Sequence, residues 1–452
     1  MLEKIGQKVN KIISILVIAV ILISCSEKKE PIIQSDLELK MNSIAEDYVK
    51  LVLNIGQYDP DFVDAYYGPE EWRSGLKSNL KFDSTAFINL STKSNNLLNE
   101  LESLAEYKAD TLETLRFRYL YKQLLACKTK IYMLNGVLLP FDEETKALYD
   151  ASAPKHNDEF FQSTIKEMDK ILPGKGDVAV RLNEFKMKFA IPADKLKDVF
   201  NAAIKECRTK TLNHIKLPDQ ESFTVEYVKD KPWGAYNWYK GNFHSVIQVN
   251  TDLPIFIDRA VDLAAHEGYP GHHVYNVLLE SNLAKKRGWK EFTVYALFSP
   301  QSLIAEGTAN FGIEVAFPGD ERIKFEKEVL FPLAGLNPDE ADLYYKVIDL
   351  QKNFSYSGNE AARNFLDGIW TRKQTVEWLQ KNALRTKDSA DKFVSFIEKY
   401  RSYVINYNLG MDIVKDYIER NGGTENNPSK RWQLFEYLLS TPQTPGGLEK
   451  TK

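Results

Sequence analysis

The sequence predicts a mainly α-helical protein that carries a small β-sheet or hairpin. Hydrophobic residues recur with the 3.6-residue period of amphipathic helices along most of the chain, whereas only two stretches alternate with the two-residue period of strands. The chain has 452 residues, and its 43% hydrophobic content is enough for a substantial core in one large domain or two fused lobes. The formal net charge of −4 gives no indication of nucleic-acid binding.

Residues 1–24 are predicted to be a signal peptide. Lysines at positions 4, 8 and 11 precede an almost purely apolar run at 12–23, which is shorter than the roughly 20 residues of a membrane span. Residues 22–25, Leu-Ile-Ser-Cys, resemble a bacterial lipobox, and this resemblance implies cleavage before Cys25 and lipid on its thiol. The alternative is an uncleaved membrane anchor, and both alternatives export and attach the protein.

Residues 25–36 are predicted to be the lipidated cysteine and a polar tether, and Ser26 favours the outer membrane. The remaining cysteines, Cys127 and Cys207, lie in helical patterns. An exported pair can form a disulfide, but two buried thiols fit the patterns equally well.

Residues 37–215 are predicted to form an N-terminal helical region. The helical period is clear at 39–53, 87–104 and 111–134, and further helices are predicted at 158–171, at 178–189 and from Pro192 toward His214. The region contains no glycine-rich nucleotide-binding loop.

Residues 216–440 are predicted to be the catalytic region, followed by a flexible tail at 441–452. Strands are expected at 223–228 and 241–250, joined by an aromatic-rich connection. The first helix after them carries a cluster of histidines. Many zinc peptidases bind the substrate backbone along an edge strand beside such a helix, although a hairpin that only packs against the helices is the alternative.

Three of the six histidines lie between His266 and His273. The pair His266-Glu267 begins like the motif H-E-x-x-H, in which two histidines one turn apart bind zinc and the glutamate activates water. The position of the second histidine is occupied by Pro270, so the helix must kink or bulge there. That break favours His272 as the second ligand, with His273 near the metal or the substrate. A histidine-rich turn without metal is the alternative.

A third ligand is expected from a later helix. Glu306 lies among small and apolar residues, which is unusual for a carboxylate without a partner. The alternative is an ordinary acid on a helix surface.

The segment His266-Glu-x-x-Pro-Gly-His272, followed by Ala-Glu306-Gly, resembles the bacterial domain-of-unknown-function family 885. The resemblance covers most of the chain after the signal segment and is strongest at 236–410. It implies a largely helical zinc peptidase with a gluzincin-like site, in which His266, His272 and Glu306 bind zinc and Glu267 is the general base. The family usually has Glu-Gly-Trp where this chain has Thr308, so the pocket shape is expected to differ.

Two further segments, 362–368 and 398–410, are similar to segments of that family, although its Pro-Gly-Gln is absent here. They supply candidates for the remaining roles in peptide hydrolysis. Tyr407 is a candidate donor to the oxyanion, and Arg401 or Arg363 is a candidate clamp for a terminal carboxylate of the substrate. For each arginine the alternative is an ion pair on a helix surface or between helices, and for Tyr407 it is a structural role.

His244, on the predicted strand before the motif, is a candidate hydrogen-bond donor to substrate. Together these features predict a large helical metallopeptidase-like fold with one zinc ion, attached to the cell envelope by lipid. The predicted activity is hydrolysis of peptides, as a carboxypeptidase or dipeptidase. The alternative is a non-catalytic envelope lipoprotein with a structural or lost metal site, or a peptide-binding protein.

Overall fold

The computed structural model of the protein describes residues 36–104, 111–231 and 233–449. Of the described residues 66% are helical and the sheets among them are small, which confirms the predicted mainly α class. Two compact units are distinguished, residues 1–40 and 41–452. Of the first unit only residues 36–40 are described, as the first part of helix α2. The predicted signal peptide and Cys25 lie outside the described residues.

In the described ranges, no helix combines the length and the apolar character that crossing a membrane requires.

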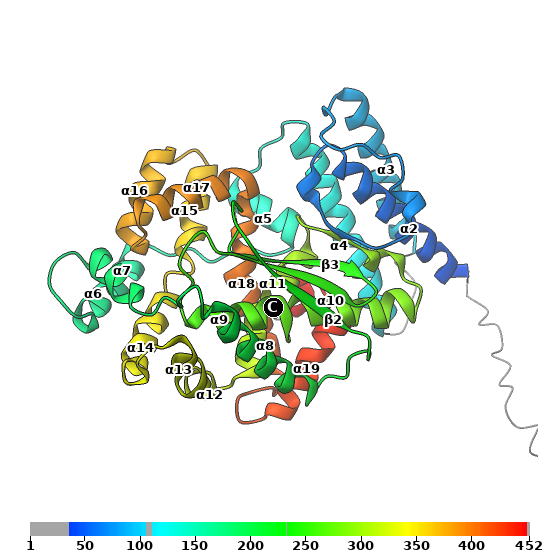
Figure 1. Cartoon of the computed structure of the whole chain (residues 1–452). Helices are drawn as coiled ribbons and strands as arrows, with labels where there is room; N and C mark the ends of the chain where they lie inside the picture. The colour runs from blue at the N-terminus through cyan, green and yellow to red at the C-terminus, as the bar shows by residue number, and fades with distance from the viewer. Residues whose placement is uncertain (1–35, 105–110, 232, 450–452) are drawn as a thin grey trace, which may run out of the picture. The chain divides into compact units, whose positions relative to one another are not determined.

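The N-terminal half of the second unit consists of helices joined by short irregular segments (Figure 1). Several begin at side-chain caps that satisfy the free N–H groups of the first turn, as where Asp83 accepts from the Ala86 N–H at 2.8 Å. The elements are α2 (Asp36–Gly56), η1 (Pro60–Phe62), β1 (Val63–Tyr66), η2 (Glu70–Trp72), α3 (Ser84–Glu102), α4 (Thr111–Leu134), α5 (Phe141–Tyr149), α6 (Asp158–Ile171), α7 (Val178–Met187) and α8 (Leu196–Leu212).

A three-stranded sheet follows, composed of β2 (Ser222–Val228), β3 (Ala235–Gly241) and β4 (His244–Asn250) in the order β2-β4-β3. Strand β2 is parallel to the central strand β4, and β3 is antiparallel to it. The aromatic-rich connection expected between two strands is therefore itself strand β3. Its period was hidden because large aromatic side chains point to both faces of the sheet, as Trp238 and Tyr239 do.

A buried carboxylate fixes the turn between β3 and β4. Asn242 and Phe243 have φ angles of 52° and 60°, as a two-residue hairpin turn requires. The Glu280 carboxylate, 2% exposed, accepts from both of their N–H groups, at 3.0 and 3.1 Å. The hairpin is thereby attached to the segment that follows the histidine motif.

The chain then returns to helices, and α11 and α18 pack side by side at the centre of the second unit (Figure 1). The elements are α9 (Asp258–Leu263), η3 (Ala264–Gly268), α10 (His272–Leu279), η4 (Glu280–Lys285), η5 (Lys290–Thr293), β5 (Val294–Ala296), α11 (Pro300–Ala316), α12 (Glu321–Phe325), η6 (Glu326–Leu330), α13 (Phe331–Ala334), η7 (Pro338–Glu340), α14 (Ala341–Lys352), α15 (Ser357–Leu366), α16 (Arg372–Ala383), α17 (Lys387–Tyr400), η8 (Arg401–Val404), α18 (Ile405–Arg420), α19 (Pro428–Ser440) and α20 (Pro445–Leu448).

Helices α11 and α18 touch backbone to backbone. A Cβ atom on Gly307 would lie 2.3 Å from the carbonyl oxygen of Gly410, and one on Gly410 would lie 2.6 Å from that of Leu303. Such distances exclude any side chain at either glycine without a shift of the helices. The two helices can therefore approach more closely than a pair with ordinary side chains at the contact.

The C-terminal segment departs from the expected flexible tail. Residues 441–449 include helix α20, in which Pro445 and Leu448 are buried, and the Gly446 N–H donates to Asp150 at 3.1 Å. Apolar burial and this hydrogen bond hold the segment against the helices. Cys127 and Cys207 are free, buried thiols, so the alternative without a disulfide applies.

We expect Gly307→Ala to lower the free energy of unfolding by about 1–3 kcal/mol, the cost of overpacking a close contact. Chemical denaturation measures this change. The matched control is Gly234→Ala, because a Cβ atom at that exposed glycine meets no atom within 4 Å. Equal effects of the two substitutions would contradict the close contact between the helices.

Candidate metal centre

The helix that carries His266 ends in one π-helical turn, η3 (Ala264–Gly268). The peptide bond before Pro270 is cis, and Gly271 then lies directly on the backbone of the preceding turn. A Cβ atom on Gly271 would meet the His266 carbonyl oxygen at 1.9 Å, so only glycine fits there. A new helix begins at His272. The predicted break at Pro270 is therefore confirmed, and it takes the form of a widened turn in which the Gly271 N–H donates to the Ala265 carbonyl at 2.9 Å.

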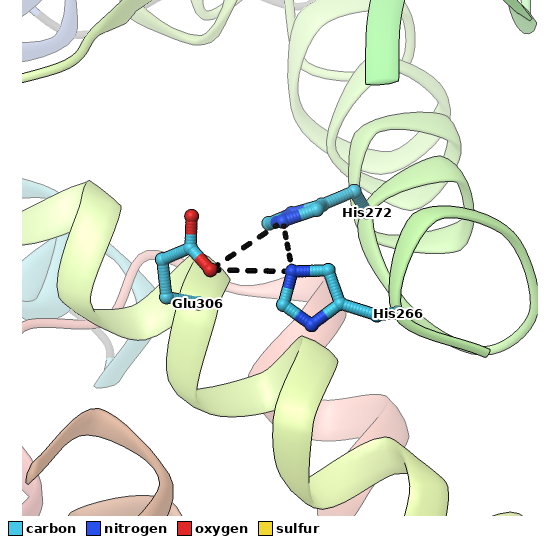
Figure 2. A group of neighbouring side chains, drawn as sticks. All are labelled: His266, His272 and Glu306. Atoms are coloured by element: carbon cyan, nitrogen blue, oxygen red, sulfur yellow. Dashed lines mark hydrogen bonds and ion pairs between the residues drawn. The ribbon is translucent and has the colours of Figure 1, made fainter. Parts of the chain in front are cut away.

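Two histidines and a glutamate converge across this break (Figure 2). Nε2 of His272 lies 3.1 Å from Nε2 of His266. Glu306 lies on helix α11. Its Oε2 is 3.3 Å from Nε2 of His266 and 3.8 Å from Nε2 of His272. Within the described ranges, these three form the group of side chains with the spacing of metal ligands.

The three donor atoms fit a small divalent cation. In a tetrahedral zinc site they lie about 3.3 Å apart, because each is about 2.0–2.1 Å from the ion. The observed separations of 3.1, 3.3 and 3.8 Å are close to that value. Glu306 Oε2 is also buried without a hydrogen-bond partner, a costly state that a metal ion would relieve.

The charges in the cluster support the same assignment. Burial favours the neutral form of Glu306, but the nearby imidazoles of His266 and His272 lower its pKa below the ordinary value. Burial likewise opposes a charge on His272, yet Glu306, Glu267 and Asp64 together raise its pKa to about 9. At neutral pH without metal, the cluster thus contains a carboxylate beside an imidazolium.

Two side chains orient the ligands from outside the cluster. Asn310 Oδ1 lies 3.2 Å from Nδ1 of His266, a contact that places the ring proton on Nδ1 and turns the Nε2 lone pair toward the cluster. The Tyr403 hydroxyl donates to Oε1 of Glu306 at 3.0 Å, which leaves Oε2 to face the imidazoles. Tyr403 was not predicted from the sequence. It stands one turn before Tyr407, but this spacing does not distinguish it among 23 tyrosines.

Glu267 and Tyr407 lie beside the ligands. The Glu267 residue is 5% exposed, and its backbone carbonyl accepts from the Asn237 side chain of β3 at 2.7 Å. This contact places the sheet next to the motif helix, as predicted. Although Tyr407 is 40% exposed as a residue, loss of water around its hydroxyl and the charges of Glu306 and Glu267 raise its pKa well above 10. Its hydroxyl therefore remains a proton donor in hydrogen bonds.

His273 points away from the ligands. It is fully buried, with Nδ1 at 2.9 Å from Ser245 Oγ and Nε2 at 2.9 Å from Glu221 Oε2. The same Glu221 carboxylate accepts from the Tyr269 hydroxyl at 2.6 Å and from Arg208 at 2.7 Å. The predicted role of His273 beside the substrate is thus replaced by a structural one. Glu221 holds residues on both sides of the Pro-Gly step and so fixes the direction of the intervening ligand.

The two arginines expected to bind a terminal carboxylate are held in ion pairs. Arg401 contacts the fully buried Glu144 carboxylate at 2.6 Å. Arg363 is 5% exposed and donates to Glu360 at 2.6 Å and to Asp142 at 3.1 Å. These contacts match the structural alternative for both, because buried carboxylates require a partner of opposite charge.

His244 lies at the start of β4, where its Nδ1 is 3.1 Å from Ser222 Oγ on β2. Its contact belongs to the sheet face opposite to that of Ser245, the residue that bonds His273. The predicted donation to substrate has no support in this position.

No known family profile matches the chain, and no curated protein matches it either. A solved structure from Colwellia psychrerythraea, assigned as a lipoprotein, has a TM-score of 0.52 and 15% identity over 80% of this chain and 68% of that one. This likeness shows a shared fold and nothing of activity. A protein described as CHT has a TM-score of 0.44 and 11% identity, covering 92% of this chain and 93% of that one. An M32 carboxypeptidase from Deinococcus radiodurans R1 has a TM-score of 0.36 and 11% identity, covering 91% and 96%. With TM-scores below 0.5, these two likenesses support no conclusion about this protein.

We expect His272→Ala to lower metal affinity by more than the roughly 10- to 100-fold that loss of an outer partner costs, because it removes a donor atom. His273→Ala should retain about one metal ion per folded chain, since that ring faces Glu221. Metal content after dialysis, with His214→Ala as an exposed control, distinguishes the two. If only the His273 variant lost its metal, His273 would be the ligand and His272 would not.

Proposed function

We propose that this protein is a zinc-dependent peptidase of the cell envelope, related to the domain-of-unknown-function family 885. The observation that carries the proposal is the convergence of two imidazole nitrogens and a buried, unpartnered Glu306 oxygen at the spacing of a zinc site. A second carboxylate, that of Glu267, and the hydroxyl of Tyr407 lie beside this cluster.

A catalytic role is favoured over a structural metal site by the number of ligands. Structural zinc sites are usually closed by four protein ligands, whereas catalytic sites have three and an open position. The cluster in the described residues offers three: His266, His272 and Glu306. The chemistry that a bound zinc ion supplies is polarisation of the scissile carbonyl and a lower pKa for a water molecule.

Glu267 is proposed to be the general base. It follows His266 directly, and on helical backbone adjacent residues point about 100° apart, so that the first can bind metal while the second faces the water. The charge of Glu267 acts on both His272 and Tyr407, which supports a carboxylate position near both. There it can accept a proton from water and transfer it to the leaving amine.

Tyr407 is proposed to donate its hydroxyl hydrogen bond to the developing oxyanion. Its raised pKa keeps the proton on the hydroxyl at neutral pH, and the position beside Glu306 and Glu267 supports a donor next to the reacting carbonyl. Tyr403 has a different role, because its hydroxyl is already bonded to Glu306. It would hold that carboxylate in the orientation that metal binding needs.

The proposed location is the envelope, with a lipid anchor at Cys25 and the outer membrane as the expected site. The lipobox-like residues 22–25 support it, and the related Colwellia psychrerythraea fold, assigned as a lipoprotein, is consistent with it. The proposed partners are peptide substrates and the membrane, through the anchor. Nucleic acid is not expected, because the net charge is −4.

Glu267→Gln should retain bound zinc but lower kcat by about 100-fold or more, the usual contribution of a general base. Metal content and peptide hydrolysis are measured on the same preparation. Glu425→Gln, at an exposed position, is the control and should match wild type. Hydrolysis by the Glu267 variant at the wild-type rate would exclude this mechanism.

Tyr407→Phe removes one hydroxyl and is expected to lower kcat by about 100- to 1000-fold, the effect of losing an oxyanion donor. KM and metal content should change little, because the hydroxyl is not a metal ligand in this assignment. Steady-state kinetics measures the effect, with Tyr437→Phe on α19 as the control. A change in KM alone would instead indicate a role in substrate binding.

A further inference from the structure

One side chain of helix α11 contacts both the ligand His266 and the helix that carries Tyr407. Oδ1 of Asn310 lies 3.2 Å from Nδ1 of His266. On the other side of the same amide group, Nδ2 donates to the backbone carbonyl of Tyr407 at 3.1 Å. Asn310 therefore bridges the π-helical turn η3 and helix α18, which are far apart in the sequence.

The contact with Tyr407 fixes which way the amide group faces. A backbone carbonyl only accepts hydrogen bonds, so the NH2 group of Asn310 must be the side that faces Tyr407. The amide oxygen then faces His266, and because that oxygen only accepts, the imidazole proton must be on Nδ1. The lone pair is left on Nε2, the atom that lies 3.3 Å from Oε2 of Glu306. The bond to α18 thus selects the form of His266 that can bind a metal ion.

The close contact between α11 and α18 brings the two ends of this bridge together. Gly307 and Gly410 touch, since a Cβ atom on Gly307 would lie 2.3 Å from the Gly410 carbonyl oxygen. Asn310 lies one turn after Gly307, and Tyr407 lies one turn before Gly410, so helices that run antiparallel at this contact place them opposite each other. Glu306 is one turn before Asn310 on the same face of α11. One helix face thus carries both the third ligand and the bridge.

Ring contacts place Tyr407 beside the same ligand. The Tyr403 hydroxyl donates to Oε1 of Glu306 at 3.0 Å, and the ring centroids of Tyr403 and Tyr407 are 5.7 Å apart. A shift of the helical turn that holds the Tyr407 carbonyl would therefore move its ring relative to the ligands.

We propose that Asn310 is a positioning residue that sets the ligand His266 and the oxyanion donor Tyr407 relative to each other. Its oxygen holds the imidazole in the metal-binding form, and its NH2 group holds the turn from which the Tyr407 hydroxyl reaches the substrate. The effect on Tyr407 rests on the proposed peptidase function, whereas the effect on His266 concerns metal binding alone. A tie that only joined two helices would need the donated bond and not the contact with His266.

Asn310→Asp separates the two contacts. The aspartate keeps an oxygen that accepts from Nδ1–H of His266, but it cannot donate to the Tyr407 carbonyl. Zinc affinity should therefore equal or exceed that of wild type, because carboxylates commonly support a metal-binding histidine in this way. The kcat should fall about 10- to 100-fold, the effect of a misplaced catalytic group. Zinc affinity is measured by competition with a chelator, and kcat with unmodified dipeptides and tripeptides.

Asn310→Ala removes both contacts. It should lower kcat as Asn310→Asp does, and in addition lower zinc affinity about 10- to 100-fold. Asn421→Asp is the matched control, because Nδ2 of Asn421 also donates to a tyrosine carbonyl of α18, that of Tyr417, at 2.7 Å, but at an exposed position. This variant should leave both zinc affinity and kcat unchanged.

Combination with Tyr407→Phe tests whether Asn310 acts through the Tyr407 hydroxyl. Once that hydroxyl is absent there is no donor left to position, so adding Asn310→Asp should lower kcat no further. A role in packing alone would instead lower kcat by the same factor in both backgrounds.

The outcomes separate this inference from the proposed function. Equal reductions of kcat with and without the Tyr407 hydroxyl would overturn the positioning role and leave the peptidase function standing. Wild-type zinc affinity in folded Asn310→Ala would show that the contact with His266 does not prepare the ligand. If wild type binds zinc but hydrolyses none of the peptides, the proposed function fails and the role toward Tyr407 fails with it. The zinc affinities of the Asn310 variants still decide the role toward His266 in that case.

Discussion

The candidate site depends on one contact between two segments of backbone. Gly271 lies on the His266 carbonyl at a distance that leaves no room for a Cβ atom. At this contact the helical path widens through the π-helical turn and the Pro-Gly step, and Nε2 of His272 lies 3.1 Å from Nε2 of His266. In a continuous helix, a residue six positions later would point about 120° away. In H-E-x-x-H a spacing of one helical turn brings the two histidines together. In this protein an irregular backbone brings His266 and His272 together.

A break of this kind must be held in place, and two buried arrangements do so. The Glu221 carboxylate binds both Tyr269 and His273, so the residues on either side of the Pro-Gly step share one acceptor. On the opposite side, the contact of Gly307 with α18 brings Tyr403 to the third ligand. The Glu221 contacts fix the direction of His272, and the Tyr403 contact fixes that of Glu306. Precise ligand positions thus arise from packing outside the cluster.

Local patterns in the sequence predicted the features with local causes. Helical periods gave the mainly α class, Pro270 required a break, and the apolar surroundings of Glu306 indicated a buried partner. The pairing of the four-residue strand β1 was not predicted, because its partner, β5, is more than two hundred residues away. Tyr403 had no distinguishing pattern among 23 tyrosines. Arg363 was predicted to bind substrate because a sequence does not reveal which acidic side chains will contact a helix in the folded protein.

Electrostatic interactions link the acidic side chains and the imidazole of His272 at the candidate metal centre. Glu306, Glu267 and Asp64 all raise the pKa of His272. Because water is largely excluded from this region, the three carboxylates also repel one another. Without metal, the proton on His272 supplies the compensating charge, which is why its pKa is about 9 although burial opposes it. A divalent cation would displace that proton and supply a second positive charge. The acids that repel one another without metal would therefore favour a bound cation.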